Sequence, residues 1–576
     1  MKRNLSYIIL LVSVLQIQNF EAGAQATGDS RLPDATLYRE KLQLFTDRDL
    51  YASGEKLSFR LHNLSHPLLK ENQWSRVFYL ELINSRNAAV ARGKYQLHSW
   101  GGEGQVSIPD TVSTGPYYLR AYTRWMRNYP ASEFFHLPLA IVNPRKISSA
   151  DLFAEGGGQG PGISEKAPGP KAGIVISSDK SSYGKREKVS VEINPESLNF
   201  SPDGYCISVI KKGYLEEVYP FTSIPGSEDP HPLKDIVFYP ETRGATVSGT
   251  LQVGEDSKPA DGYLLGLTVM GSNPDYMEIR TDEDGRFRIP VQQHRGNKDA
   301  LLSIHSNRDE TVRIHMDDAY SSEFSTVPIP VRDLSGERKA LVEEAMVNAQ
   351  LRAAFELPDR EGVHAAESDP EFPFYGTPEF KYRMEDYVSL PDLEEFFFEI
   401  VPQVQVVINE DQSDLLVLDE GGKLLYTPPL ILLDHVPVTD IGKLLTVSPL
   451  RIDFIDVVNR IYVRGGNTYG GIVSIHTAQG DRAGIALPDG SSLIKFTGLT
   501  DLEERLSPDY EATERKARMP DLRNTLYWEA RFDIAPNKGA NFEFYTSDQT
   551  GEFMVVVRGI SSEGKVLTGT CEFMVK

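Results

Sequence analysis

Residues 46–61 read TDRDLYASGEKLSFRL, and residues 178–193 read SDKSSYGKREKVSVEI. The two stretches align without gaps, and Asp, Tyr, Glu, Lys and Ser recur at equivalent places. In both stretches a turn before the shared Glu leads into a strand in which apolar and polar residues alternate. Repetition of one sandwich-opening element predicts two related domains.

Short alternating runs continue after both copies. VFYLELI at 77–83 and YYLRAY at 117–122 are typical of sandwich strands, and Gly, Pro, Asn and Asp separate such runs. Between the copies, residues 156–170 contain GGGQGPG and APGP, which can neither bury apolar surface nor hold a strand ladder. We therefore expect a β-sandwich over 33–147 and a Gly/Pro linker over 148–170.

Both copies resemble the opening strands of the macroglobulin-type domains of alpha-2-macroglobulins, whose pattern is Asp-(Lys/Arg)-x-x-Tyr-x-x-Gly-(Glu/Asp). The first copy matches every position of this pattern, through Asp47, Arg48, Tyr51, Gly54 and Glu55. The second copy matches all positions but one, through Asp179, Lys180, Tyr183 and Glu187. Arg186 stands where Gly is usual, so we expect the second turn to differ or to be strained.

A third unit is expected over 245–330. Residues 247–251 (VSGTL) and the later run TDEDGRF at 281–287 resemble the carboxypeptidase-regulatory-like fold, a small sandwich in which Thr-Asp-x-x-Gly-x-Phe closes a hairpin. The carboxylates of Asp282, Glu283 and Asp284 suggest calcium as an alternative. The turn itself requires Asp and Gly, and the spacing of an EF-hand loop is absent, so we expect no metal site there.

Two helices interrupt the strand pattern. Residues 333–357 favour a helix that Ser335 caps, with Leu341, Ala345 and Ala349 on one side, inside a helix and connecting segment at 333–388. A second, short helix is expected after Ser389, with Pro391 in its first turn.

An ordered trio of strands follows the second helix. PLILLDHVPV at 429–438, IDFIDVV at 452–458 and YGGIVSI at 469–475 resemble the plug domain of TonB-dependent outer-membrane receptors. The residues that carry the resemblance most clearly are Asp434, Pro437, Tyr469, Gly470 and Gly471. His435 replaces a usual Gly, and Asp456 replaces a usual Glu. The resemblance implies a small α+β plug-like domain, which we place at 389–500.

Receptors of that family enclose the plug in a 22-stranded barrel, which needs well over about 200 residues at roughly ten residues per strand. Only 96 residues follow Gly480, so we expect no barrel in this chain. The sequence leaves open whether the plug-like domain stands free or docks on a separate barrel protein.

The tail from Leu522 reads as four strands, and residues 171–220 supply about three. We therefore expect 171–240 and 519–576 to join into one discontinuous macroglobulin-like sandwich around the inserted units. A disulfide between Cys206 and Cys571 is one interpretation of the only two cysteines in the chain. Two unpaired thiols, at least one of them buried, are the alternative.

The first 26 residues carry Lys2 and Arg3, an apolar run over 7–15 and Ala24-Gln25-Ala26, the order of a secretory signal peptide at 1–26. The formal charge of the 576-residue chain is −22, which disfavours nucleic acid and anionic lipid as partners. We find no segment that spans a membrane as a helix. These features predict an exported protein of the periplasm or the outer-membrane surface.

The chain is thus expected to be mainly β, with tandem macroglobulin or immunoglobulin-like β-sandwiches, an inserted regulatory-like sandwich and the plug-like domain. We find no nucleophile, metal or phosphate motif, so we assign no catalytic residue, cofactor or metal. The thioester sequence Cys-Gly-Glu-Gln of protease-trapping macroglobulins is missing. The leading hypothesis is a non-enzymatic envelope protein that binds another protein, such as an outer-membrane barrel protein.

Two other functions remain open. One is a carbohydrate- or peptide-binding accessory protein, which stacked Trp and Tyr on one sandwich face would favour. The other is an enzyme with an unrecognised carboxylate site. Aromatic residues at Trp125, Tyr129, Phe134 and Phe135 are either an exposed contact surface or part of a core.

Overall fold

The computed structural model describes most of the chain after residue 37. The segments outside the description are 1–37, 66–68, 70–73, 146–173, 196–200, 216–232, 234–235, 272–273, 293, 306–311, 326–336, 355–372, 410–412, 465–466, 489, 503–507, 512–519 and 536–537. The expected signal peptide, the expected linker at 148–170 and Ser335 therefore lie outside the described residues. Strands dominate the regular structure, which confirms the prediction of a mainly β fold.

The first sandwich packs a three-stranded sheet, in the order β1-β3-β6, against a five-stranded sheet, in the order β2-β8-β7-β4-β5. Its strands are β1 (Leu42–Thr46), β2 (Leu50–Ala52), β3 (Lys56–Asn63), β4 (Val77–Asn84), β5 (Ala89–Gln96), β6 (Gly102–Ser107), β7 (Gly115–Thr123) and β8 (Phe135–Val142). Trp125, Tyr129, Phe134 and Phe135 are each at most 2% exposed, so these aromatics belong to the core and form no contact surface.

The second sandwich takes its strands from two distant parts of the chain. Its sheets have the orders β10-β31-β30-β12-β28 and β29-β11-β9. The strands are β9 (Ile174–Ser178), β10 (Ser182–Tyr183), β11 (Lys188–Pro195), β12 (Tyr205–Lys211), β28 (Thr525–Phe532), β29 (Ala540–Tyr545), β30 (Gly551–Ile560) and β31 (Val566–Val575). Each sheet combines strands from both sides of the insertion, and their apolar faces share one core.

The third unit also has two sheets, β14-β13-β17 with β19 beside β13, and β16-β15-β18-β27. Its strands are β13 (Thr246–Val253), β14 (Lys258–Pro259), β15 (Leu264–Val269), β16 (Asp275–Arg280), β17 (Arg286–Pro290), β18 (Asn297–Ile304), β19 (Val312–Met316) and β27 (Ser492–Thr497). Strand β27 falls inside the range expected for the plug-like domain. It joins this sheet instead because Ile494 and Phe496 pack against the core of the third unit.

The turn at 281–287 uses one of its three carboxylates internally. Asp282 accepts hydrogen bonds from the backbone N–H groups of Asp284 and Arg286, and Gly285 adopts a φ of +69°. No group of three or more His, Cys, Asp or Glu within the described residues is arranged to hold a metal ion.

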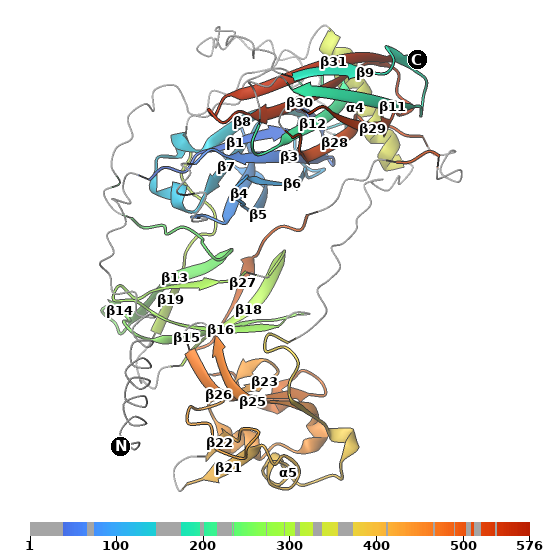
Figure 1. The fold of residues 1–576 in the computed structure, drawn as a ribbon. Coiled ribbons are helices and arrows are strands. Elements are labelled where there is room, and N and C mark those ends of the chain that lie inside the picture. The colour runs from blue at the N-terminus through green and yellow to red at the C-terminus, as the bar shows by residue number, and fades with distance from the viewer. Residues whose placement is uncertain are drawn as a thin grey trace, which may run out of the picture.

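The fourth unit, residues 373–488, contains one mixed sheet in the order β20-β25-β26-β23-β24, a hairpin and two short helices. Its elements are β20 (Phe380–Arg383), α5 (Leu393–Ile400), β21 (Val404–Ile408), β22 (Ser413–Val417), β23 (Leu430–Leu433), β24 (Val436–Pro437), α6 (Ile441–Leu445), β25 (Ile452–Arg464) and β26 (Asn467–Thr477). The sandwiches lie at one end of the molecule, and the fourth unit lies at the other (Figure 1).

Both expected helices are present. Helix α4 (Glu337–Ala354) packs Val342 and Ala345 against residues of both sandwiches, and α5 begins after its cap, Asp392. Within the described part of the chain, no helix has the length and apolar character that crossing a membrane requires.

The two cysteines do not form a disulfide. Cys206 on β12 points toward Phe45 and Ile560, whereas Cys571 on β31 packs against the core on the opposite face. Strand β30 lies between them, so their strands are roughly 10 Å apart, beyond the Cα separation of about 7 Å that a disulfide allows.

This placement predicts different thiol reactivities. Cys206 is fully buried, and burial raises the pKa of its thiol, whereas Cys571 is partly exposed. In the native protein we expect a maleimide to label Cys571 at least about tenfold faster than Cys206, measured by peptide mapping. Equal labelling rates, or a loss of both thiols that a reductant reverses, as a disulfide between them would give, would contradict the structure.

Candidate functional site

The two copies of the repeated motif fold with the same hydrogen bonds. Tyr51 donates its hydroxyl hydrogen bond to Asp47 Oδ1 at 2.7 Å, and Tyr183 donates to Asp179 Oδ1 at 2.8 Å. The same Oδ1 atoms accept the backbone N–H of Ser58 at 3.1 Å and of Ser190 at 2.9 Å. The shared Asp, Tyr and Ser therefore join the turn to the strand that follows it.

The shared Glu closes the turn in each copy. Glu55 accepts from the backbone N–H of Ala52 at 2.8 Å, and Glu187 accepts from that of Gly184 at 2.5 Å. A basic residue neutralises each carboxylate, with Arg48 at 3.1 Å and Lys180 at 2.5 Å. In both sandwiches the short strand that contains the motif's Tyr pairs in parallel with the last strand of that sandwich in chain order, β2 with β8 and β10 with β31.

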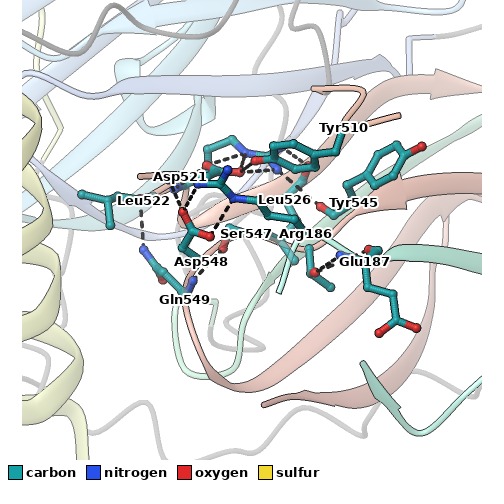
Figure 2. A network of polar contacts seen from close by, with 12 residues as sticks. Arg186, Glu187, Tyr510, Asp521, Leu522, Leu526, Tyr545, Ser547, Asp548 and Gln549 are labelled. Carbon is teal, nitrogen blue, oxygen red and sulfur yellow. Dashed lines mark hydrogen bonds and ion pairs between the residues drawn. The ribbon is translucent and has the colours of Figure 1, made fainter. Parts of the chain in front are cut away.

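The copies differ where Gly54 is replaced by Arg186. Both residues have a left-handed backbone, with φ of +84° and +55°, a conformation that costs a non-glycine residue roughly 1–2 kcal/mol. The turn is therefore strained, as the sequence predicts. The Arg186 side chain is held by two contacts to Asp548, at 2.8 and 2.6 Å, and lies over the Tyr510 ring (Figure 2).

Asp548 also contacts a second acidic residue, Asp521. It accepts the backbone N–H of Asp521 at 2.7 Å, and the Asp521 carboxylate binds Arg523 at 2.8 Å and Tyr510 at 2.5 Å (Figure 2). Burial alone would raise the pKa of Asp521, but the Arg523 guanidinium outweighs it and holds that pKa below its usual value. Asp521 is thus a buried carboxylate that stays ionised and joins the second motif copy to segment 520–526.

The first motif copy lies in the interface between the sandwiches. Asp47 Oδ2 accepts from the Thr525 hydroxyl at 2.8 Å, and the Asp47 carbonyl accepts from the Ser208 hydroxyl at 2.5 Å. Asn524 donates to Glu55 at 3.2 Å, and its side-chain oxygen accepts from Gln549 at 3.1 Å. Residues 521–525 and 546–549 therefore bridge the two copies.

The residues that carried the plug resemblance have structural roles in the fourth unit. Asp434, at a φ of +48°, accepts hydrogen bonds from Thr477 and from the backbone N–H of Arg482. Pro437 lies in β24. A Cβ on Gly470 would lie 1.9 Å from the Thr427 carbonyl, and Gly471 has a φ of +94°. The structure brings these residues to one sheet.

Tyr469 instead connects the fourth unit to the third. Its hydroxyl donates to Glu278 at 2.7 Å, and Asn467 donates to the same carboxylate oxygen at 3.0 Å. Arg464 donates to the Tyr276 carbonyl at 2.8 Å and pairs with Asp275. The end of the β25–β26 hairpin is thereby held on β16.

A polar cluster inside the fourth unit was not predicted from the sequence. The rings of His435 and His476 lie 4.9 Å apart, and Tyr375 donates to Asp456 at 2.9 Å. Lys381 lies 3.2 Å from the other oxygen of Asp456. Burial, then His435 and Lys381, lowers the pKa of His476 to about 3, and burial lowers that of His435. The sequence did contain one signal for this cluster, because His435 and Asp456 depart from the Gly and Glu that are usual at those places in the plug pattern.

Comparisons with known proteins give distant structural matches. No family model matches the chain, and no curated protein matches it. Alpha-2-macroglobulins of Salmonella and Escherichia coli are among the similar solved structures, each with 9% identity and a TM-score of 0.23. They align with 93% and 95% of this chain, which covers only 39% and 40% of theirs. The BSP domain of a biofilm-associated protein matches 48% of this chain, with a TM-score of 0.13.

The two tyrosines offer a matched test of the repeated motif. Tyr51→Phe leaves a buried carboxylate without its donor, whereas the Asp179 that Tyr183→Phe affects is exposed to water. We expect a loss of about 2 kcal/mol for Tyr51→Phe and about 1 kcal/mol or less for Tyr183→Phe, measured by urea unfolding. Equal losses of unfolding free energy would show that burial does not strengthen the contribution of the Tyr51–Asp47 hydrogen bond to stability.

The histidine cluster predicts acid sensitivity of the fourth unit. The folded pKa of His476 is below its unfolded value, so the stability it contributes is present above about pH 6.5 and is lost as pH falls toward 3, by up to about 1.4 kcal/mol per pH unit. Hydrogen exchange of β25 and β26, corrected for intrinsic rates, should show less protection at pH 5 than at pH 7.

His476→Gln should make that change smaller, and His315→Gln, at an exposed position of β19, should not affect it. If the wild type and His476→Gln lose protection equally, the buried imidazole is not the cause.

Proposed function

We propose that this chain is an exported, non-enzymatic scaffold of the cell envelope that binds a protein partner at the outer membrane, such as the barrel of a TonB-dependent receptor or transport system. In this proposal the macroglobulin-like sandwiches form a base, the regulatory-like third unit is a spacer, and the plug-like fourth unit contacts the partner.

The observation that carries the proposal is the distribution of exposed apolar side chains. In the described part of the first sandwich, no large apolar side chain is exposed. The described residues of the fourth unit include ten that are exposed, namely Tyr387, Val388, Phe398, Ile408, Leu424, Tyr426, Leu450, Ile461, Val463 and Leu487. Exposed apolar side chains gathered on one unit of a soluble fold are typical of a protein-binding region.

The attachment of the fourth unit supports the same function. Tyr469, Asn467 and Arg464 hold it on the Glu278 and Asp275 side chains of β16. Contacts between the sandwiches and to the third unit combine buried polar pairs, for example Arg124 with Ser248 at 2.7 Å, with shared apolar clusters. The apolar surface is therefore presented on a fixed base, which reduces the conformational entropy lost on binding.

The carbohydrate-binding alternative has less support. It requires exposed Trp and Tyr side chains stacked on one sandwich face, and all four Trp residues are buried or half-buried. The described residues also offer no grouped ligands for a metal-dependent enzyme.

The proposal is tested with the tagged full chain and detergent-solubilised outer membrane of the native host. We expect one barrel protein to co-purify, and Ile461→Ser with Val463→Ser to reduce its recovery at least about fivefold, because both side chains lie on the same exposed face of β25. Val175→Ser, on exposed β9 of the second sandwich, is the matched control and should have no effect. Recovery of the chain alone from the soluble fraction would refute the proposal.

A further inference from the structure

We propose that the outer face of α5 is a docking surface for a cationic protein surface, in which an apolar pocket bordered by Lys or Arg side chains receives Phe398. This inference rests on the proposed function and specifies which surface of the fourth unit makes the contact and with what chemistry.

Phe398 is unusual among the aromatic residues of this helix. It is 80% exposed, whereas Phe396 and Phe397 beside it are at most 1% exposed. A Phe side chain contributes most to an interface when it enters a pocket and loses its contact with water. The fold gains nothing comparable from Phe398, since the core face of α5 is already supplied by Leu393, Phe396 and Phe397.

Helical spacing places acidic side chains around this ring. Glu394 and Glu395 precede Phe398 by four and three residues, so they lie on the same face of the helix, and Glu399 follows it. All three are exposed, and none forms an ion pair with another described residue. The ring therefore stands among carboxylates whose charges are not neutralised within the described chain.

The charge continues into the segment before the helix. Residues 384–400 contain six acidic residues and no Lys or Arg. Tyr387 packs its ring against Phe396 at 5.8 Å, which holds the neighbouring Glu385 and Asp386 beside the helix. Asp392 has a local role, because it caps α5 by accepting the backbone N–H of Glu395 at 3.0 Å.

This charge decides between the possible occupants. A second copy of the same face would bring like charges together, and an anionic lipid surface would be repelled as well. A partner with Lys or Arg around an apolar pocket gains both burial of the ring and complementary charge. The surface is also held in place, since the opposite side of α5 is in the core of the fourth unit.

Leu450 provides the internal comparison. It is 77% exposed in the same unit, but its neighbours are Pro449 and Arg451 rather than carboxylates. A surface that works through exposed apolar area alone would involve Leu450 as much as Phe398. A surface that also needs the acidic border would involve Phe398 only.

Site-specific photocrosslinking in cells of the native host tests the proposal. The full chain carries p-benzoylphenylalanine in place of Phe398, Leu450 or Val175, in separate variants. We expect the probe at 398 to give one crosslinked protein at about tenfold or more the yield of the other two positions. Mass spectrometry of the crosslinked peptide should place the bond at an apolar residue whose surface neighbours include Lys or Arg.

Charge is tested with the probe kept at 398. Neutralising the border with Glu394→Gln, Glu395→Gln and Glu399→Gln should reduce the yield at least about fivefold, as should raised salt. The matched control neutralises three exposed carboxylates of the third unit, Glu255→Gln, Glu283→Gln and Asp284→Asn, and should leave the yield unchanged. Circular dichroism and the thermal midpoint verify that each variant is folded.

The outcomes separate this inference from the proposed function. Crosslinks from 450 but not from 398, an unchanged yield after neutralisation, or crosslinks to lipid or to a second copy would overturn the α5 surface while the scaffold function stands. No crosslink from any position, together with failure of the outer-membrane pull-down, would overturn both.

Discussion

The carboxylate of Asp47 is the contact on which the arrangement of the sandwiches depends. One of its oxygens accepts from Tyr51 and from the backbone of Ser58, which closes the turn of the first sandwich. The other oxygen accepts from Thr525 of the second sandwich. Asp47 is fully buried, so each of these hydrogen bonds replaces one that water would otherwise supply. A single side chain thus stabilises a local turn and a contact between two domains.

The duplicated motif has taken on two roles. In the first copy the turn is enclosed by the partner sandwich, and its polar atoms are used across the interface. In the second copy the turn borders solvent, and the Arg186–Asp548 pair holds a backbone conformation that glycine would adopt without strain. The hydrogen bonds of Asp, Tyr and Glu are kept in both copies because they act within the turn and do not depend on what lies outside it.

The fourth unit, at the far end of the molecule, also uses some residues for contacts with its neighbour and leaves others exposed. Residues at the tip of the β25–β26 hairpin bind β16 and hold the fourth unit on the third, which leaves its remaining faces free for other contacts (Figure 1). Exposed apolar side chains lie on those faces, and the acidic border of α5 gives one of them a definite charge. Both polar and apolar contacts join the units, and the apolar side chains that stay exposed on the fourth unit are available to a partner.

Local pattern in the sequence was enough to predict the mainly β class, the repeated turn, the two helices and the strain at Arg186, because each depends on residues close together in the chain. It could not decide whether Trp125 and Phe134 are buried, or that β27 returns to the third unit, since burial depends on which segments distant in sequence pack together. The separation of Cys206 and Cys571 has the same origin, for strand order puts β30 between them. The His435–His476 cluster and the exposure of Phe398 likewise arise only in the folded chain, where the side of a helix or strand that faces the core is settled by tertiary packing.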